Sequence, residues 1–422
     1  MTRDIQEGIY YNKMSKFTNF GNHSYAILFL RVLGDMHASE VGRSLRKLWN
    51  IYKLLKNGKL IDLHESVVPN GGLSVLIGYG PEIFKIRGIK KKIPRDFKDS
   101  QFLPAKSNKP ILEGSGISYV NDGGENVGTS QHIVIQFISE TQLASSRAIV
   151  ETSEYLSGLY NGNSCLRLTK IYTGFQRDDM RSWLGFHDGL SNMRSTKERK
   201  DAICIDRQYN QLIPDDFWTI GGTYMSFLRI EIGLKFWRKV KRKDQEIIVG
   251  RDKLTGKPLV GLDEYGNPLT IGKWRITTPV TKYNRLYHDH PDYFKIPKAS
   301  NVLKRLDIPS SMASLTQSHI GRTRHIANIN TKDPTSRRIY RQNFEFVDFH
   351  SNERKPVKVG MNFVSFQNDP RRLLFILNDP RWLGQSNFGG SSSSMGLLSV
   401  QASGMFFIPP TEREFPGYNL FS

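Results

Sequence analysis

The sequence predicts an α+β protein built from two tandem units, of which the second is enlarged by an insertion. Short runs rich in β-branched and aromatic residues alternate with stretches of helical periodicity, which indicates a mixture of strands and helices. The order of these segments recurs in the second half of the chain, where a Pro- and Lys-rich stretch at about 251–310 interrupts it. The chain has 422 residues, enough for two domains. We expect an N-terminal domain at 1–180 and a C-terminal domain at 181–422.

Four strands and two helices are expected in the first half. The strands are short apolar runs at Tyr25–Val32, Leu73–Gly78, His132–Ile138 and Leu166–Tyr172. A helix after the first strand is indicated by apolar residues at helical spacing, with Ser39 as the expected N-cap and Asn57-Gly58 as its end. Thr141–Leu159 is expected to form the second helix. Strand, helix, two strands, helix, strand is the order of a ferredoxin-like unit.

The second half repeats this order with longer connections. Strands are expected at Thr223–Ile232, Ile339–Phe346, Met361–Phe366 and Met405–Ile408. Helical stretches are expected around Leu234–Val249 and at Asp369–Leu377. The chain therefore predicts two related ferredoxin-like units, the second carrying the insertion.

The charge balance is strongly basic, with 60 Lys and Arg against 40 Asp and Glu, a net charge of +20 and a pI near 9.8. Such a field attracts anions. The basic residues are dispersed over the stretches 85–98, 195–200 and 237–243, and none of these forms a nucleic-acid recognition motif. We therefore expect attraction of small anionic substrates, and no specific nucleic-acid partner.

The sequence contains no feature that indicates export or membrane insertion. No apolar run is long enough to span a bilayer, and the first residues show no secretory signal. Cys165 and Cys204 are the only cysteines, too few for a disulfide framework or a thiolate metal site. The default expectation is a cytoplasmic protein in a reducing compartment, without a membrane partner.

Residues 185–192, GFHDGLSN, place an acid between two glycines. Glycine lets the backbone turn tightly or approach a ligand closely, and an acid held in such a loop is suited to proton transfer. A surface turn is the alternative interpretation, because Gly and Asp are common turn residues. The stretch alone does not decide between these two interpretations.

A second group of candidates lies at 310–346. If Ser310–Arg324 is a helix, His319 falls on its apolar face, whereas His325 falls near the polar one. A histidine on an apolar face is usually a packed core residue. Here a strand with Arg341 follows, and the next strand, GMNFVSF, is apolar enough to form a wall. A histidine, an arginine, an acid and an apolar wall are the components of a haem peroxidase site.

These segments resemble the dye-decolorizing peroxidases (DyP-type haem peroxidases). GFHDG matches the family signature G-x-x-D-G. Further counterparts occur in the same order along nearly the whole chain: RDIQEGI, GGTYMSFLRIEIGLKFW, QEIIVGRDKLTGKPL, RRIYRQNFEF, GMNFVSFQNDP and SGMFFIPP. The resemblance implies two tandem ferredoxin-like units of the dimeric α+β barrel type. It also implies a peroxidase that reduces hydrogen peroxide and oxidises dyes or phenolic donors in one-electron steps.

The resemblance also assigns residues to a haem site. Asp188 corresponds to the distal acid and Arg341 to the distal arginine. The glycines of the loop, Gly185 and Gly189, would let it approach the porphyrin. Met361, where the family usually has Leu, and Phe363 would line the peroxide side, since residues two apart on a strand share a face.

The iron ligand has two candidates. His319 fits the family pattern through its neighbours Ser318 and Ile320 and through Arg322, which could pair with a haem propionate. His325 fits through other positions of the pattern and is the fallback. The apolar-face argument favours His319. No C-x-x-C-H motif is present, so we expect non-covalently bound haem b.

Other functions of the same fold stay open at this point. One alternative is a haem-handling protein that releases iron or oxidises porphyrin, and another is a non-catalytic haem-binding protein. For the peroxidase, the expected partners are hydrogen peroxide and small aromatic, anionic electron donors. The oligomeric state is left open.

Overall fold

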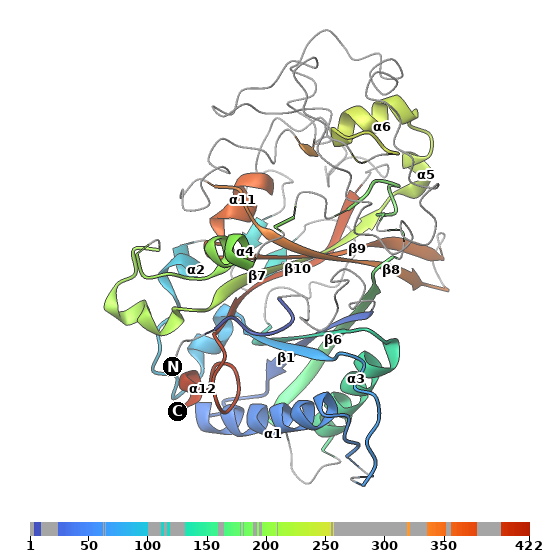
Figure 1. Cartoon of the computed structure of the whole chain (residues 1–422). Coiled ribbons are helices and arrows are strands. Elements are labelled where there is room, and N and C mark those ends of the chain that lie inside the picture. Colours follow the sequence, from blue (N-terminus) through green and yellow to red (C-terminus); the bar gives the residue numbers. More distant parts are fainter. Residues whose placement is uncertain are drawn as a thin grey trace.

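Eight strands close into one antiparallel barrel (Figure 1). This computed structural model describes residues 4–9, 24–99 except 62 and 64, 111–113, 116–118, 131–158, 164–256 except 178, 180, 189–191, 194–195, 209 and 255, 319–320, 336–351, 356–377 and 398–422. The barrel strands are β1 (Ser24–Val32), β2 (Ser74–Tyr79), β5 (Ile133–Ser139), β6 (Leu166–Phe175), β7 (Thr223–Ile232), β8 (Tyr340–Phe349), β9 (Val357–Gln367) and β10 (Leu398–Ile408). A separate two-stranded sheet contains β3 (Ile111–Glu113) and β4 (Gly116–Ser118).

The barrel consists of two half-sheets with the same internal order. Its strands follow one another as β6-β1-β5-β2 in the first half and β10-β7-β9-β8 in the second. In both halves the first and third strands of the chain order are central and the second and fourth are outside. The α+β prediction is confirmed, and the repeated strand order agrees with the expected ferredoxin-like order. The boundary between residues 180 and 181 stays a prediction.

Two seams join the half-sheets into a barrel. At one seam β10 pairs with β2 through Phe407 and Tyr79, and at the other β6 pairs with β8 through Phe175 and Glu345. Between the seams lies an apolar interior to which strands of both halves contribute, including Phe29, Phe227 and Phe366. Because the barrel is closed, each of the eight strands pairs with a neighbour on both sides along at least part of its length.

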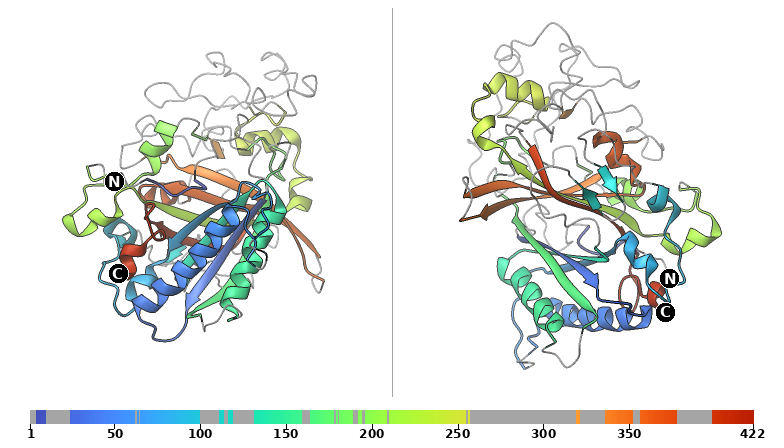
Figure 2. Two further views of the ribbon diagram at one scale, coloured as in Figure 1. Left: turned by 60° about the horizontal axis from the view of Figure 1, so that its bottom comes forward. Right: turned by 180° about the vertical axis from the view of Figure 1, so that it is seen from behind.

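Two helices cover the outer face of the first half-sheet. α1 (Ala38–Lys56) and α3 (Gln142–Leu156) lie side by side across these strands, as the left view of Figure 2 shows. Their apolar faces pack on the outward side chains of β2 and β5 in one core. The expected helices are thus confirmed. The N-cap of α1 is His37 rather than Ser39, because the His37 ring accepts from the Ser39 amide and Glu40 accepts from the His37 amide.

Shorter helices accompany the second half-sheet. They are α4 (Thr196–Ile203), α5 (Leu234–Trp237), α6 (Arg242–Val249) and α11 (Arg371–Leu377), and they lie around the upper half in Figure 1. The stretch Leu234–Val249 was expected to be helical and forms two helices. The Gln245 side chain donates to the carbonyls of Trp237 and Val240 at the break, which satisfies groups that a continuous helix would have bonded.

The remaining described elements are short. They are the 3-10 helices η1 (Pro81–Lys85) and η2 (Pro214–Thr219), and the helices α2 (Arg95–Asp99) and α12 (Tyr418–Phe421). Among the described helices none is long and apolar enough to cross a membrane. Most of the insertion at 251–310 lies outside the described residues.

Candidate functional site

Three polar residues alternate along β8 and point away from the barrel interior. Tyr340 and Phe344 contribute to the apolar interior, so Arg341, Asn343 and Glu345 lie on the outer face. The β8–β9 register places Ser365, Phe363 and Met361 directly opposite them, on the same face. Phe363 packs against a second apolar core, formed on this face by Leu228, Ile230 and Met405 among others. The outer face of the second half-sheet is therefore apolar across its centre and polar along β8.

Asp188 reaches this polar edge from the loop after β6. One carboxylate oxygen accepts a hydrogen bond of 2.5 Å from the Asn343 amide nitrogen. The other lies 3.9 Å from a guanidinium nitrogen of Arg341. Both side chains of this ion pair are about a quarter exposed, at 28% and 25%. The structure thus brings together the acid and the arginine that the sequence pointed to, and adds Asn343, which the sequence analysis missed.

A second carboxyl group lies beside this pair. Glu345 is only 5% exposed, and one of its oxygens has no hydrogen-bond partner among the described residues. Burial, and then the nearby negative charge of Asp188, raise the pKa of Glu345 to about 8. Arg177 opposes this shift only in part. With this raised pKa, Glu345 is mostly protonated at neutral pH.

Arg341 is fixed in place by its backbone. Asn192 accepts from the Arg341 amide at 3.1 Å and donates to the Arg341 carbonyl at 2.6 Å. Among the described residues β6 pairs with β8 only through Phe175 and Glu345, and Asn192 takes the place of a strand partner further along β8. This prevents the strand end that carries the guanidinium from fraying.

The loop that carries Asp188 folds as a tight turn. The amide of Ser182 donates to the Phe186 carbonyl, and the amide of Gly185 donates to the Ser182 carbonyl. Gly185 has a φ of +85°, and a Cβ atom there would lie 2.6 Å from the side chain of Lys253. Only glycine fits this position without strain. The structure gives Gly185 this role in the turn, whereas its predicted contact with haem stays a prediction.

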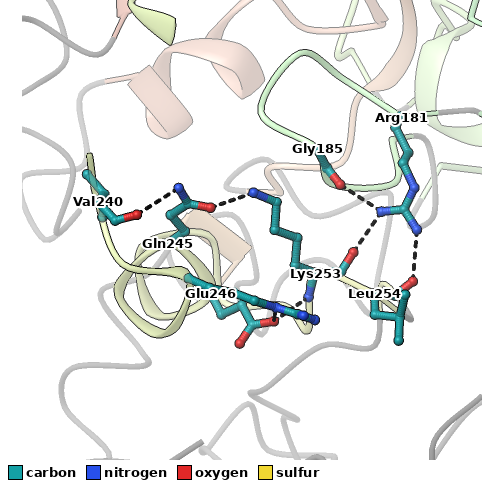
Figure 3. A network of polar contacts seen from close by, with 8 residues as sticks. Arg181, Gly185, Val240, Gln245, Glu246, Lys253 and Leu254 are labelled. Atoms are coloured by element: carbon teal, nitrogen blue, oxygen red, sulfur yellow. Dashed lines mark hydrogen bonds and ion pairs between the residues drawn. The ribbon is translucent and has the colours of Figure 1, made fainter. Parts of the chain in front are cut away.

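Arg181 ties the turn to the segment after α6 (Figure 3). Its guanidinium donates to the carbonyls of Gly185 at 2.7 Å, Lys253 at 2.7 Å and Leu254 at 2.9 Å. It also lies 2.9 Å from the ring nitrogen Nε2 of His187. Burial, and then the positive charge of Arg181, lower the pKa of His187 to about 4. His187 is therefore neutral at physiological pH and accepts from Arg181.

The same segment is anchored to α6. The Lys253 ammonium donates to Gln245 at 2.5 Å, and the Lys253 amide donates to Glu246 at 2.9 Å (Figure 3). Because both ends of this network are fixed, the turn presents Asp188 to β8 on a rigid support. The question that GFHDG poses thus has a structural answer. Gly185 allows the tight turn, His187 is buried beside Arg181, and Asp188 faces Arg341.

Other predicted site residues are less completely described. His319 lies in a helical turn with Ile320 and is partly exposed. Gly189, Arg322 and His325 lie outside the described residues. Within the described part of the chain, no three His, Cys, Asp or Glu side chains gather as metal ligands. The assignment of the iron ligand stays a prediction.

Comparisons with known proteins agree with this geometry. A family model described as "Dyp-type peroxidase, C-terminal" matches residues 179–413, more than half of the chain. Curated relatives include the deferrochelatases of Escherichia coli strain K12 and of Shigella flexneri. Each is 28% identical over 186 residues, which cover 44% of this chain and 34% of the relative. The match thus spans about a third of the length of these relatives.

Solved structures are similar over almost their whole length. Ferric DtpA from Streptomyces lividans aligns with a TM-score of 0.64 and 19% identity, covering 100% of this chain and 96% of that one. A DyP-type peroxidase from Cellulomonas bogoriensis gives 0.61 and 16%, with 99% of both chains covered. A variant of Rhodococcus jostii DypB in complex with heme gives 0.53 and 16%, with 96% of both chains covered. At this identity the structures show the shared fold, and the family model shows the lineage: the chain belongs to the Dyp-type peroxidase family.

Proposed function

We propose that this protein is a haem-dependent peroxidase that reduces hydrogen peroxide and oxidises aromatic donors one electron at a time. Dyp-type peroxidases are oxidoreductases that act on peroxide and bind haem. The observation that carries the proposal is the Asp188–Arg341 pair. A carboxylate and a guanidinium face each other at 3.9 Å along one edge of an apolar sheet face.

The donor set of the described residues fits a haem on this face. The planar, apolar porphyrin requires an apolar wall, to which the partly exposed Phe363 is proposed to contribute. Asn343 and Glu345 each have a buried oxygen without a hydrogen-bond partner among the described residues, which indicates that a further hydrogen-bonding group belongs at this polar edge. For the iron, His319 is the proposed ligand, because an imidazole in a helix is the usual proximal ligand of peroxidases.

The residues of the chain divide the work on peroxide. The haem, when bound, supplies the iron at which the O–O bond of peroxide is cleaved. Asp188 would accept a proton from one oxygen of peroxide and deliver it to the other, which leaves as water. Arg341 stabilises the negative charge that develops on the leaving oxygen, and its charge is permanent. Asn343 holds Asp188 in the orientation in which its other oxygen faces Arg341.

The donors are proposed to be anionic aromatic compounds. A net charge of +20 raises the local concentration of anions near the protein. We expect kcat/KM to be higher for a sulfonated dye than for a cationic dye of similar size. The preference should shrink as salt rises, because exposed charges are screened beyond about 10 Å at 0.1 M ionic strength. Equal kcat/KM values at low salt would refute this part of the proposal.

Haem binding provides the direct test of the proposed function. The purified protein is titrated with haemin and its Soret band is recorded, together with peroxide-dependent oxidation of a sulfonated anthraquinone. His319→Ala should abolish the spectrum of histidine-ligated ferric haem, whereas His325→Ala should leave it nearly intact. The reverse outcome assigns the ligand to His325. Failure of the native protein to bind haem at all would overturn the proposal.

A second candidate function is the removal of iron from haem. It is favoured by the relatives that are named deferrochelatases. The haem-loaded protein is incubated with and without peroxide, and fluorescence of iron-free porphyrin is measured. A peroxidase gives donor oxidation without porphyrin release, whereas an iron-releasing protein gives fluorescent porphyrin in proportion to the haem lost.

A further inference from the structure

A pocket of about 620 Å³ lies between η2 and the segment that precedes α2. Its lining combines three consecutive lysines, Lys90–Lys92, with Asp215, Phe217 and Trp218. The volume lies within the range of sites that take a small organic ligand. In Figure 1 the segment with η2, in yellow-green, projects beside α2 at the left of the molecule. The Asp188–Arg341 pair lies along β8, on the other side of β7 and β9.

The two sites are separate. Arg341 is linked to β10 through the register Arg341–Ser365–Ser226–Met405, which crosses three strand spacings. At about 4.8 Å for each spacing this amounts to about 14 Å before the pocket itself is reached. A small ligand in the pocket does not touch the Asp188–Arg341 pair.

The lysine segment is held in place rather than free in solvent. At its start the Arg87 carbonyl accepts from the Ala38 amide at 2.8 Å, and Gly88 turns with a φ of +91° against the ring of His37. At its end Arg95 donates to the Gln211 carbonyl at 3.1 Å. These contacts fix the direction of the segment between its ends. The contacts on either side therefore keep the three lysines beside η2.

The charges of the pocket favour an anion. Lys92 pairs with Asp215 at 3.0 Å, which neutralises one lysine and joins the two walls. Lys90 is exposed and Lys91 is partly buried, and neither has an ion pair with a described residue. Two of the lysines that line the pocket thus have no counter-charge within the described part of the chain.

The aromatic walls favour a planar ligand. The Trp218 ring contacts Phe84 at a centroid distance of 6.0 Å and Phe407 at 5.0 Å, so it is supported from below by the sheet. The guanidinium of Arg207 lies 4.3 Å from the centre of the Phe217 ring. Rings held in this way offer large contact area at little entropic cost. A free phosphate would contact the lysines and make no use of the aromatic rings.

We propose that this pocket is a second binding site, separate from the Asp188–Arg341 pair, which takes a small planar aromatic anion such as an arene sulfonate or carboxylate. The ammonium groups of Lys90 and Lys91 bind its acidic group, and Trp218 and Phe217 contact its ring. Binding here requires no haem. The pocket can therefore fail the test below while the proposed peroxidase function stands, and the reverse also holds.

Isothermal titration with three probes tests whether both parts of the pocket contribute. Naphthalene-2-sulfonate carries ring and charge, methanesulfonate carries the charge alone, and 2-naphthol carries the ring without a charge at pH 7. The titrations use the protein in 0.15 M salt, with and without haem, so that distant charges are screened. We expect naphthalene-2-sulfonate to bind at least about tenfold more tightly than either partial probe, and equally with or without haem. Equal binding of methanesulfonate would show a site for simple anions and overturn the proposal.

Variants locate the binding to the pocket. Lys90→Gln/Lys91→Gln should weaken naphthalene-2-sulfonate about tenfold or more, since each lost contact to a charged group contributes substantially to binding. The matched control, Lys47→Gln/Lys53→Gln, removes the same charge from the exposed side of α1 and should leave the affinity unchanged. Trp218→Phe keeps the packing on Phe407 and should weaken binding by a smaller factor. Equal loss in the control pair would show that the overall field attracts the probe, and would overturn the assignment.

Discussion

The two half-sheets share one strand order and differ in what their outer faces carry. On β2, the second strand of the first half, the outward residues are Val75, Ile77 and Tyr79, which belong to the core beneath α1 and α3. On β8, the second strand of the other half, the corresponding face carries Arg341, Asn343 and Glu345. The same topology therefore supports an apolar core in one half and a polar site in the other.

The difference shows how the fold can tolerate a site that lowers the free energy of unfolding. Glu345 is buried, and one of its oxygens has no partner among the described residues, which destabilises the second half because a buried polar group without a partner loses its hydration. The first half has the opposite character, since its outer core is closed by two amphipathic helices. Strand pairing at both seams joins the two halves into one barrel. We therefore expect the halves to unfold together, so that the stable core of the first half offsets the cost of burying Glu345 in the second.

A matched pair of phenylalanines should show the largest effect. Phe137 lies on the third strand of the first half and is fully buried at 0% exposure, whereas Phe363 on the third strand of the second half is partly exposed. Phe137→Ala should lower the free energy of unfolding by about 3–5 kcal/mol, the usual cost of a large core cavity. Urea denaturation of both variants measures this.

Phe363→Ala should cost less stability than Phe137→Ala, because less apolar surface is lost. It should instead weaken haem binding in the titration described above. If Phe363→Ala is the more destabilising variant and haem binding is unchanged, the two faces do not differ in the way proposed.

Arg341→Leu should cause the next largest effect, on activity rather than on stability. Removing one donor that stabilises charge in the transition state typically costs about 100- to 1000-fold in rate. Asp188→Asn should slow the reaction with peroxide less, because a water molecule can partly replace the proton carrier, whereas nothing replaces a fixed charge. Stopped-flow measurement of the haem-loaded protein with peroxide compares the two. If Asp188→Asn is the slower variant, proton transfer limits O–O cleavage.

The sequence predicted the repeated order because each strand has its own apolar pattern. Asp188 and Arg341 could be placed in one site because they match family positions, and the structure puts them 3.9 Å apart. Asn343 and Glu345 were missed, although they alternate with Arg341 in YRQNFEF. A period of two places all three on one face, but only the direction of that face tells a polar site from a solvated edge. That direction depends on barrel closure, which no local pattern encodes.

Glu345→Gln should change how stability depends on pH. The pKa of Glu345 is raised from 4.5 in a flexible chain to about 8 in the fold. Its neutral form is therefore compatible with burial, and the stability associated with it is present at low pH and lost as pH rises through about 8. Gln cannot ionise. Between pH 5 and pH 8 the native protein should therefore lose roughly 2–3 kcal/mol of unfolding free energy that the variant does not lose.

Unfolding by urea at pH 5 and pH 8 gives this difference directly. His187 acts in the opposite direction, because its pKa of about 4 favours the fold above pH 6.5 and costs stability as pH falls toward 4. It contributes equally to both proteins, so subtraction removes it. A variant that shows the same pH dependence as the native protein would mean that Glu345 is ionised in the fold.

The smallest expected effect belongs to a polar pair in the helical layer of the first half. The Tyr52 hydroxyl lies 2.8 Å from the Thr152 hydroxyl, and burial raises the pKa of Tyr52, which keeps it protonated. Thr152 also donates to the Ala148 carbonyl at 2.6 Å, so removal of the tyrosine hydroxyl leaves it with one partner. Tyr52→Phe should therefore cost only about 0.5–1.5 kcal/mol. A double-mutant cycle with Thr152→Val isolates the coupling between the two hydroxyls.

Haem binding and the reaction with peroxide should be unchanged in all three variants, because the helical layer is separated from β8 by the barrel interior. If any of these variants reacts more slowly with peroxide, the first half does more than stabilise the fold.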